Sequence, residues 1–390
     1  MRFLHISDTH LGYRQYGLLE REQDFLDVFN EAIDIAINKN VDFIIHTGDF
    51  FHTSRPSNKT IIDSINLLKK LSDKNISMFC IPGNHDRGNS VKDISPLQIL
   101  ENFGLKLINS GVKEFNGIDI IGVKYIPKTA LRKLNGLKVA LEKLLEKSKQ
   151  DYKILMLHQE FYPYFLDSKL MLDEEIPIEY NYTGIGHYHI AEEPIKRDNN
   201  SYIVHIGSTE FTAYNKNEEN KSKFVALVDI NLDKTDIRYI ELKKRRRFLY
   251  RFLDDNNIDE ELDRLNNEIE KINDTSDKKP IVILKGEFKK LSQDNVLKLL
   301  KEKNIDVDNG RILYLKNMFI FPSNSLDYKG EIFKSEDEII KNCLTEYLKE
   351  DLELKDKLLD LINTLKSFDD LDTVKVYLKE NPEVIENLIK

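Results

Sequence analysis

The sequence has no tryptophan and only two cysteines, Cys80 and Cys343, which lie far apart along the chain. Because they form no CxxC pair, neither a zinc ribbon nor a disulfide framework is plausible, and a reducing compartment fits. No apolar run approaches the roughly 20 residues of a membrane-spanning helix. The opening residues, MRFLHISDTH, also contain no apolar signal-peptide core. We therefore expect a cytoplasmic protein with no membrane partner.

Basic residues are outnumbered, with 58 Lys and Arg against 67 Asp and Glu. Residues 331–390 account for much of the excess, because they hold 9 Lys, no Arg and 16 acidic residues. Overall acidity therefore does not exclude a nucleic-acid partner, since a local basic face can bind it. All nine histidines lie between residues 5 and 205. We expect any chemistry that needs imidazole in the N-terminal half.

The hydrophobic pattern indicates a large α/β domain followed by two smaller parts. Short apolar runs predict buried strands at 2–6, 42–46, 76–81, 118–123, 153–158, 201–206 and 223–230. Apolar residues at helical spacing predict helices at 23–40, 58–75 and 134–149. The first of these helices lies between the first two strands, which is the βαβ order of an α/β domain.

The composition changes near Lys243, where the run KKRRRF begins. The elements predicted beyond it are a helix at 256–273, a strand at 280–286, a helix capped by Ser292, and a strand at 311–321. The predicted parts are a body at 1–242, a small α/β unit at 243–321, a linker at 322–335 and an acidic helical tail at 336–390.

Five short motifs carry the candidate chemistry, and each lies at or just beyond the end of an expected strand. They are SDTH (7–10), TGDFFH (47–52), GNHD (83–86), LHQ (157–159) and GHYH (186–189). In α/β sheets, ligands bind outside the carboxyl ends of the strands, so five such loops can converge on one crevice. One DxH or HxH pair alone is usually accidental, and the prediction depends on the five together.

The residue types in these motifs predict the kind of site. In an extended chain residues i and i+2 point the same way, so Asp8 can act with His10, and His187 with His189. Two carboxylates, one amide and four imidazoles suit manganese, iron or zinc. Seven side chains are too many for one zinc, but they suit two metals about 3.5–4 Å apart that share a carboxylate, as in phosphate-ester hydrolysis. His85 is left free to face the substrate.

The motifs DTH, GDFFH, GNHD, LHQ and GHYH resemble the calcineurin-like metallophosphoesterase superfamily. Within it the match is to SbcD-type nucleases of DNA double-strand-break repair, because His52 stands where general members have an aspartate. The motifs cover residues 7–189, and beyond about residue 240 the resemblance is one of layout. It implies an α/β fold: a four-layer sandwich of two mixed sheets flanked by helices, with a small α/β cap and a helical C-terminal tail.

The resemblance also implies a role for each motif residue. Two manganese ions per subunit would be held by seven ligands: Asp8, His10 and His189 on the first metal, Asn84, His158 and His187 on the second, and Asp49 between them. His85 would steady the transition state or protonate the leaving oxygen. His52 would support His85 or touch phosphate, and Asp86 would orient His85.

The activities implied are 3′–5′ exonuclease action on duplex ends and endonuclease action on single strands or hairpins. The protein would be a nucleoid-associated homodimer acting with an SbcC-type coiled-coil ATPase. A small-molecule phosphodiesterase shares every metal ligand and is the alternative, although it needs neither the cap nor the tail. A non-enzymatic scaffold is the second alternative, and the intact ligand set argues against it.

Three surfaces are predicted with a simpler explanation beside each. DNA contact is assigned to Tyr13, Arg14, Gln15, Tyr16, Lys243, Lys244, Arg245, Arg246, Arg247 and Arg251. For the basic run at 243–248 and for Arg251, the simpler explanation is a solvated strand or hinge with ordinary surface charge. A two-fold dimer contact, or core packing, is assigned to Ile62, Leu97, Leu100 and Phe103. ATPase docking, or packing on the protein's own body, is assigned to Ile340, Leu344, Tyr347, Leu348, Leu358, Leu361, Ile362 and Leu365. We expect His5, His46 and His205 to be core histidines, because they lie within apolar runs.

Overall fold

The structure is a computed structural model of the chain, which divides into two units, Met1–Phe321 and Pro322–Lys390. It describes residues 1–321 except 88–93, 132–135, 167, 215–217, 219–220 and 232–233, together with Leu358 and Leu361. The predicted linker and tail helices, and all the tail docking candidates except those two leucines, lie outside the described residues. Across the described residues, no helix is long and apolar enough to cross a membrane.

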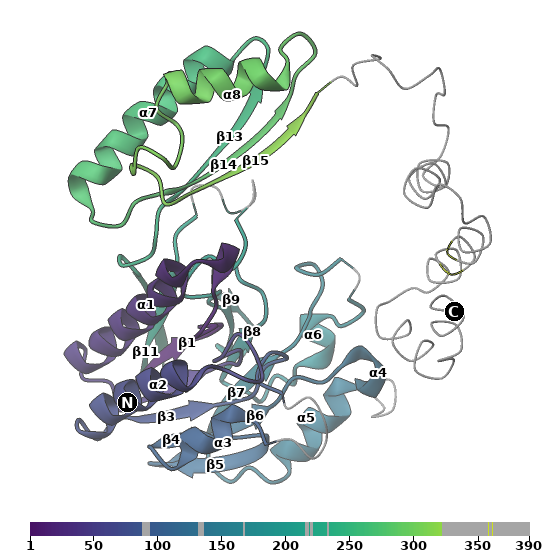
Figure 1. The fold of residues 1–390 in the computed structure, drawn as a ribbon. Helices are drawn as coiled ribbons and strands as arrows, with labels where there is room; N and C mark the ends of the chain where they lie inside the picture. The colour runs from purple at the N-terminus through teal and green to yellow at the C-terminus, as the bar shows by residue number, and fades with distance from the viewer. Residues whose placement is uncertain are drawn as a thin grey trace. The chain divides into compact units, whose positions relative to one another are not determined.

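The first of two large sheets contains six strands in the order β12-β11-β1-β2-β3-β4. Four of them run parallel: β1 (Arg2–Ile6), β2 (Phe43–His46), β3 (Ser77–Cys80) and β4 (Leu105–Leu107). The strands β11 (Phe224–Asn231) and β12 (Lys234–Glu241) complete it antiparallel. Its outer face packs against α1 (Leu19–Asn38), α2 (Asn58–Ser72) and α3 (Pro96–Glu101), as Figure 1 shows.

The second sheet has the order β5-β6-β7-β8-β10-β9. Its parallel strands are β6 (Ile118–Val123), β7 (Tyr152–His158), β8 (Tyr182–Gly186) and β10 (Tyr202–His205). The edges β5 (Ser110–Phe115) and β9 (Ile195–Lys196) pair antiparallel. The helices α5 (Leu137–Leu145) and α6 (Leu172–Glu175) cover the outer face, with the short α4 (Lys128–Leu131) beside them.

Alternate residues of each strand enter different cores, because successive side chains of a strand point to opposite faces. In β1, Leu4 packs toward α1 and α2, whereas Phe3 packs between the sheets. Phe3 meets Tyr182 of the second sheet there, with ring centroids 5.1 Å apart. The two sheets therefore lie face to face between two helical layers, and the predicted four-layer sandwich is confirmed.

The cap consists of a parallel three-stranded sheet and two helices. Its elements are β13 (Phe248–Asp254), α7 (Ile258–Thr275), β14 (Ile281–Glu287), α8 (Gln293–Glu302) and β15 (Tyr314–Ile320). Val282 and Leu284 pack under the helices, whereas Ile281 and Ile283 face Phe211 of the body. Ser292 caps α8 as predicted, since its Oγ accepts from the Asn295 amide at 3.3 Å.

Several strands had no predicted range, among them β8 (Tyr182–Gly186), although the GHYH motif was expected to lie at the end of a strand. Its segment, YTGIG, is rich in glycine, which weakens the strand signal. The structure explains these glycines: a Cβ on Gly184 would lie 2.8 Å from the His5 ring, and one on Gly186 would lie 2.3 Å from the Thr47 carbonyl. At these two positions the close approach of the sheets requires glycine, although glycine has a low propensity for β-strands.

Candidate metal centre

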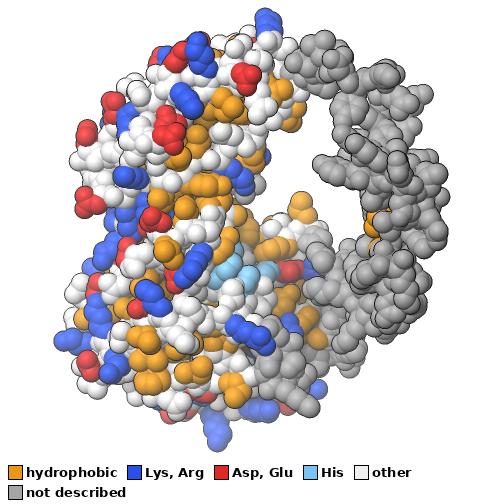
Figure 2. Space-filling model, viewed as in Figure 1, with side chains coloured by type: hydrophobic (Ala, Val, Ile, Leu, Met, Phe, Trp, Pro, Cys, Tyr) orange, Lys and Arg blue, Asp and Glu red, His pale blue; other side chains and the backbone are white. Residues whose placement is uncertain are grey.

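The five motifs meet at the carboxyl ends of strands from both sheets. SDTH, TGDFFH and GNHD follow β1, β2 and β3 of the first sheet, whereas LHQ and GHYH end β7 and β8 of the second. Histidine side chains form one group on the surface in Figure 2, and the motif histidines that are partly exposed are His52, His85, His187 and His189. The convergence predicted from the sequence is what the structure shows.

The backbone at this edge is unusual. Asp8, His10, Asp49 and His187 have φ angles of 50°, 44°, 52° and 84°. Asparagine accounts for most other positive-φ residues besides glycine. Aspartate and histidine also adopt this region more often than most residues, at a cost of roughly 1–3 kcal/mol. Backbone hydrogen bonds hold it, including Asp8 N–H to the Gly48 carbonyl at 3.1 Å and His10 N–H to the Asp49 carbonyl at 3.0 Å. Strain of this kind gathers where side-chain direction matters for function.

One group of possible metal ligands contains Asp8, His10, Asp49 and His189, each with a ligand atom within 4.8 Å of the others. His10 Nε2 lies 3.2 Å from His189 Nε2 and 3.8 Å from Asp49 Oδ2. His189 Nε2 lies 3.6 Å from Asp8 Oδ1. Two carboxylates and two imidazoles thus point at one centre.

A second group contains Asp49, His158 and His187, again within 4.8 Å. His158 Nε2 lies 3.4 Å from Asp49 Oδ2, 3.0 Å from Asn84 Oδ1 and 3.2 Å from His187 Nδ1. Asn84 therefore belongs with this group, and Asp49 belongs to both. Facing imidazole nitrogens repel through their lone pairs unless a proton or a cation lies between them, so the donor set fits two divalent metals.

The pKa shifts of Asp49, His158 and His10 also indicate a site that can hold cations. Burial opposes ionisation of Asp49, but His158, His10 and His85 hold the pKa of Asp49 well below its usual value. Burial lowers the pKa of His158, but Asp49 and Asp8 outweigh it and raise that pKa to about 9. Burial keeps the pKa of His10 well below its usual value. Buried carboxylates that stay ionised need cations beside them.

Three supporting residues were missed by sequence reasoning. His158 Nδ1 lies 2.8 Å from the Thr47 carbonyl, and His189 Nδ1 lies 2.6 Å from Thr212 Oγ1. The His187 ring meets Glu160 Oε1 at 3.4 Å. Such partners select the nitrogen that faces a metal. Glu160 directly follows LHQ and could have been found from the sequence, whereas nothing in the sequence marks Thr212.

His85 stands beside both groups with its orientation set by the backbone. Its Nδ1 lies 2.7 Å from the His52 carbonyl, and its Nε2 lies 3.9 Å from Asp49 Oδ2. The His52 ring stacks between those of Tyr13 and His85, with centroids 3.6 and 5.1 Å away. His52 thus contacts His85, and Tyr13 contributes to this stack.

The prediction that Asp86 orients His85 is corrected by the structure. Asp86 is fully buried, and its carboxylate accepts from the amides of Phe50, Phe51 and Gly83 at 2.8–3.0 Å. Its oxygens are therefore occupied by three backbone N–H groups rather than by the His85 ring. Asp86 therefore ties the GDFFH loop to the GNHD loop.

The structure buries Arg246 and Gln15, which corrects the DNA-contact prediction for these two, whereas the other residues of the set stay predictions. Arg246 is 5% exposed and binds Asp24 at 2.5 Å, and Arg245 pairs with Glu241 at 3.2 Å. Arg251 pairs with Glu268 at 2.5 Å, and Arg14 with Glu22 at 2.5 Å. Gln15 is buried, and the Tyr16 ring stacks on that of Tyr314. Lys243, Lys244 and Arg247 are exposed.

The dimer prediction is corrected for Leu97 and Leu100, which are completely buried in the core beneath α3. Helical spacing of the apolar residues placed this stripe on the core side. Ile62 is 57% exposed and Phe103 is 38% exposed, so these two stay predictions. Hydrophobic side chains gather on the surface around α2 in Figure 2. His5, His46 and His205 are buried as expected.

Comparisons with known proteins agree with this site. Residues 1–191, which contain all five motifs, match the calcineurin-like phosphoesterase family. The chain is also 35% identical to the DNA double-strand break repair protein Mre11 of Sulfurisphaera tokodaii over 311 residues, covering 78% of each chain. It belongs to the Mre11 family of calcineurin-like phosphoesterases. The chain is 32% identical to the Mre11 protein of Sulfolobus acidocaldarius, over 90% of each chain. It is 31% identical to the Mre11 protein of Saccharolobus solfataricus, over 94% of this chain and 96% of the relative. The resemblance seen in the motifs is thus confirmed for the superfamily.

Proposed function

We propose that the chain is a DNA nuclease of double-strand-break repair that uses two divalent metal ions, manganese by preference. The observation that carries this proposal is that Asp49 belongs to both ligand groups. A shared carboxylate between two metals is the arrangement used to hydrolyse phosphate esters. The Mre11 relatives, which are named as DNA double-strand break repair proteins, support DNA as the substrate.

The chain's own residues divide the work between the two metal positions. Asp8, His10 and His189 would hold the first metal, Asn84, His158 and His187 the second, and Asp49 would bridge. When bound, the metals would supply a water of lowered pKa and stabilise charge on the phosphoryl oxygens. Thr212 and the Thr47 carbonyl occupy the outer ring nitrogens of His189 and His158, so that Nε2 of each faces the centre.

His85 would act on the substrate rather than on a metal. The His52 carbonyl can only accept a hydrogen bond, so the proton on His85 lies at Nδ1. Nε2 then faces the centre, where the imidazolium form can donate to a phosphoryl oxygen or protonate the leaving oxygen. The stack with Tyr13 restricts the His52 ring and the backbone that holds His85.

The wider assembly follows from the SbcD-type resemblance. We propose 3′–5′ exonuclease action on duplex ends, endonuclease action on single strands or hairpins, and a homodimer acting with an SbcC-type ATPase. Ile62 and Phe103 are exposed apolar side chains available for the two-fold contact. The tail, which includes Leu358 and Leu361, would dock the ATPase.

The test is manganese-dependent cleavage of end-labelled duplex DNA beside cleavage of bis-p-nitrophenyl phosphate, with the native chain and His85→Gln. We expect the native chain to degrade the duplex, and the variant to bind manganese with native affinity but lose at least roughly 100-fold in rate. Turnover of the small ester alone would favour a small-molecule phosphodiesterase. Failure to bind manganese would refute the metal site itself.

A further inference from the structure

The loop at residues 207–212, which follows β10, connects the metal centre to the cap. On the metal side, Thr212 Oγ1 lies 2.6 Å from Nδ1 of His189. The His189 carbonyl accepts from the Ser208 amide at 3.1 Å and from Lys223 Nζ at 2.9 Å. Both the ring and the backbone of this ligand are therefore fixed by the loop and by the residue that packs beside it.

On its other side, the same loop packs into the underside of the cap. Phe211 is 1% exposed, and its ring lies 5.4 Å from that of Phe248 at the start of β13. Glu210 accepts from the Phe211 amide at 2.7 Å and from the Arg246 amide at 2.9 Å. The loop therefore cannot shift without disturbing the segment that leads into the cap.

A buried arginine, Arg21, connects this loop to residues 243–247, the segment between body and cap that we call the hinge. Arg21 is completely buried and donates to Gln15 Oε1, Asp24 Oδ2 and the Phe211 carbonyl at 2.7–3.0 Å. Gln15 in turn donates to the Thr212 carbonyl at 2.8 Å. The carboxylate of Asp24 accepts two bonds from Arg246, at 2.5 and 3.0 Å. Hydrogen bonds thus run without a gap from the hinge to the residue that holds His189.

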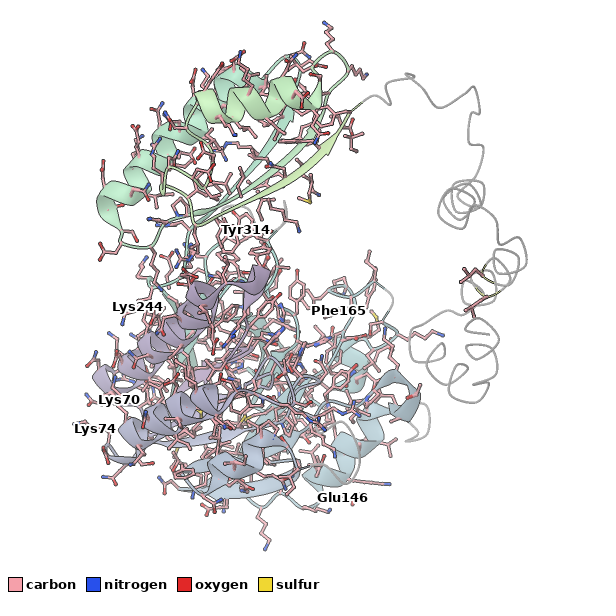
Figure 3. All side chains as sticks on the ribbon, viewed as in Figure 1. Lys70, Lys74, Glu146, Phe165, Lys244 and Tyr314 are labelled. Carbon is pink, nitrogen blue, oxygen red and sulfur yellow. The ribbon has the colours of Figure 1, made fainter. Side chains whose placement is uncertain are left out.

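A second contact joins the cap to the loop that follows the first motif. The rings of Tyr16 and Tyr314 stack with centroids 4.5 Å apart, and Figure 3 shows Tyr314 at the base of the cap. Around the other metal position, the ring of His187 stacks on Phe165 and lies 5.7 Å from that of Tyr125, both in the body. Among the described contacts, the cap thus connects to the first ligand group and not to the second.

We propose that Thr212 is a positioning residue for His189, and that loop 207–212 makes the geometry of the first metal position depend on how the cap docks. The proposal rests on the two-metal site of the proposed function. A cap displaced by a bound substrate or partner would pull on Phe211 and Arg246, and through Thr212 on one metal ligand. Affinity for one metal would then report the position of the cap, while the other metal stays bound.

The first arm of the test substitutes the hydroxyl, with matched controls from the same loop. Manganese binding to the metal-stripped full chain is measured by calorimetry for the native protein, Thr212→Val, Thr212→Ser and Thr209→Val. Thr209 is buried in the same loop, and its hydroxyl has no hydrogen-bond partner among the described residues. We expect Thr212→Val to weaken one of two binding events about tenfold. Thr212→Ser should restore it and Thr209→Val should match the native chain.

The second arm acts from the cap side. Arg246→Met removes the hinge ion pair, and Arg311→Met is its control, because Arg311 pairs with Glu270 at 3.1 Å inside the cap. We expect Arg246→Met to weaken the same event several-fold and Arg311→Met to leave both unchanged. Should Arg246→Met fail to give a cooperative thermal transition, Tyr16→Leu tests the same junction without uncovering a buried charge.

The outcomes separate this inference from the proposed function. A native chain that binds no manganese overturns the metal site and the inference together. A native chain that binds two manganese ions and cleaves DNA keeps the proposed function whatever the variants do. Within that result, native binding by Thr212→Val, or equal weakening of both events, overturns the positioning role. Native binding by the hinge variants overturns the dependence on the cap.

Discussion

Adding one methyl group at Gly83 should disable the second metal position. A Cβ there would lie 2.0 Å from Asp49 Oδ1 and 2.4 Å from the Asp49 amide nitrogen. Because a Cβ essentially never comes within 3.0 Å of such an atom, one of the two loops must move by about 1 Å. Asp49 has little freedom to yield, since its φ of 52° is already strained and its Oδ1 accepts the His85 amide at 2.9 Å. The displacement therefore falls on the GNHD loop, which carries Asn84.

Overpacking of this kind costs about 1–3 kcal/mol, which corresponds to a fall in Tm of roughly 2–12 °C in a domain of this size. Manganese binding at the second position should weaken by at least roughly tenfold. Calorimetric titration and thermal unfolding measure the two effects. Gly111→Ala is the matched control, because a Cβ there meets nothing within 4 Å and the residue has no positive φ. Native metal affinity and Tm in Gly83→Ala would refute the reasoning.

Three further predictions concern charge. Asp24→Asn should lower the free energy of unfolding by about 3–5 kcal/mol, because the buried Arg246 loses its counter-charge. In the same urea titration the control Asp63→Asn, on the surface of α2, should lower it by less than about 1 kcal/mol. Burial opposes the charge of Asp24, but Arg246, Arg21 and Lys278 lower its pKa, so its contribution is present above about pH 4 and is lost as the pH falls through the lowered value. Burial lowers the pKa of His5 and of His205 to about 3, so both stay neutral in the folded chain while they bind a proton in the unfolded chain below pH 6.5. The free energy of unfolding should therefore fall by about 1.4 kcal/mol per pH unit for each histidine as the pH drops below 6.5. Urea unfolding at pH 7 and pH 5 measures this fall. Manganese at 100 times its Kd should raise stability by about 2.7 kcal/mol over the chelated chain, and a Tm unchanged by chelator would contradict the metal site.

The ligand set was accessible to sequence reasoning because its chemistry is local. Each motif places its side chains within a few residues of a strand end, and strand ends of parallel sheets share one edge. Asp8 and His10 can therefore be assigned to one group from the order of residues alone, whereas the same rule is wrong for His187 and His189, which lie in different ligand groups. The glycines beside them, such as Gly48 and Gly83, also mark a close approach of two segments.

The errors arose where a long-range partner decides the role of a side chain. Arg246 has the same basic character as Lys244, but only Arg246 meets Asp24, which lies 222 residues away. Leu97 and Phe103 both belong to an apolar segment, but the packing of α3 buries the first and exposes the second. Asp86 was assigned to its neighbour in the sequence, whereas its partners include Phe51, 35 residues earlier. Charge and hydropathy identify such residues without identifying their contacts.

The two sheets must pack before either ligand group can form, because each group takes side chains from both sheets. Asp49 comes from the first sheet, whereas His158 and His189 come from the second. His5 joins the sheets beneath the site, with its imidazole between the hydroxyls of Tyr182 and Thr47 at 2.9 and 3.0 Å. Metal binding therefore stabilises the packed arrangement over an unfolded chain, in which the ligands are dispersed. The proposed cap contacts would act on a site that the sheets have already assembled, so we expect a change at residues 243–247 to alter one proposed metal position without unfolding the body.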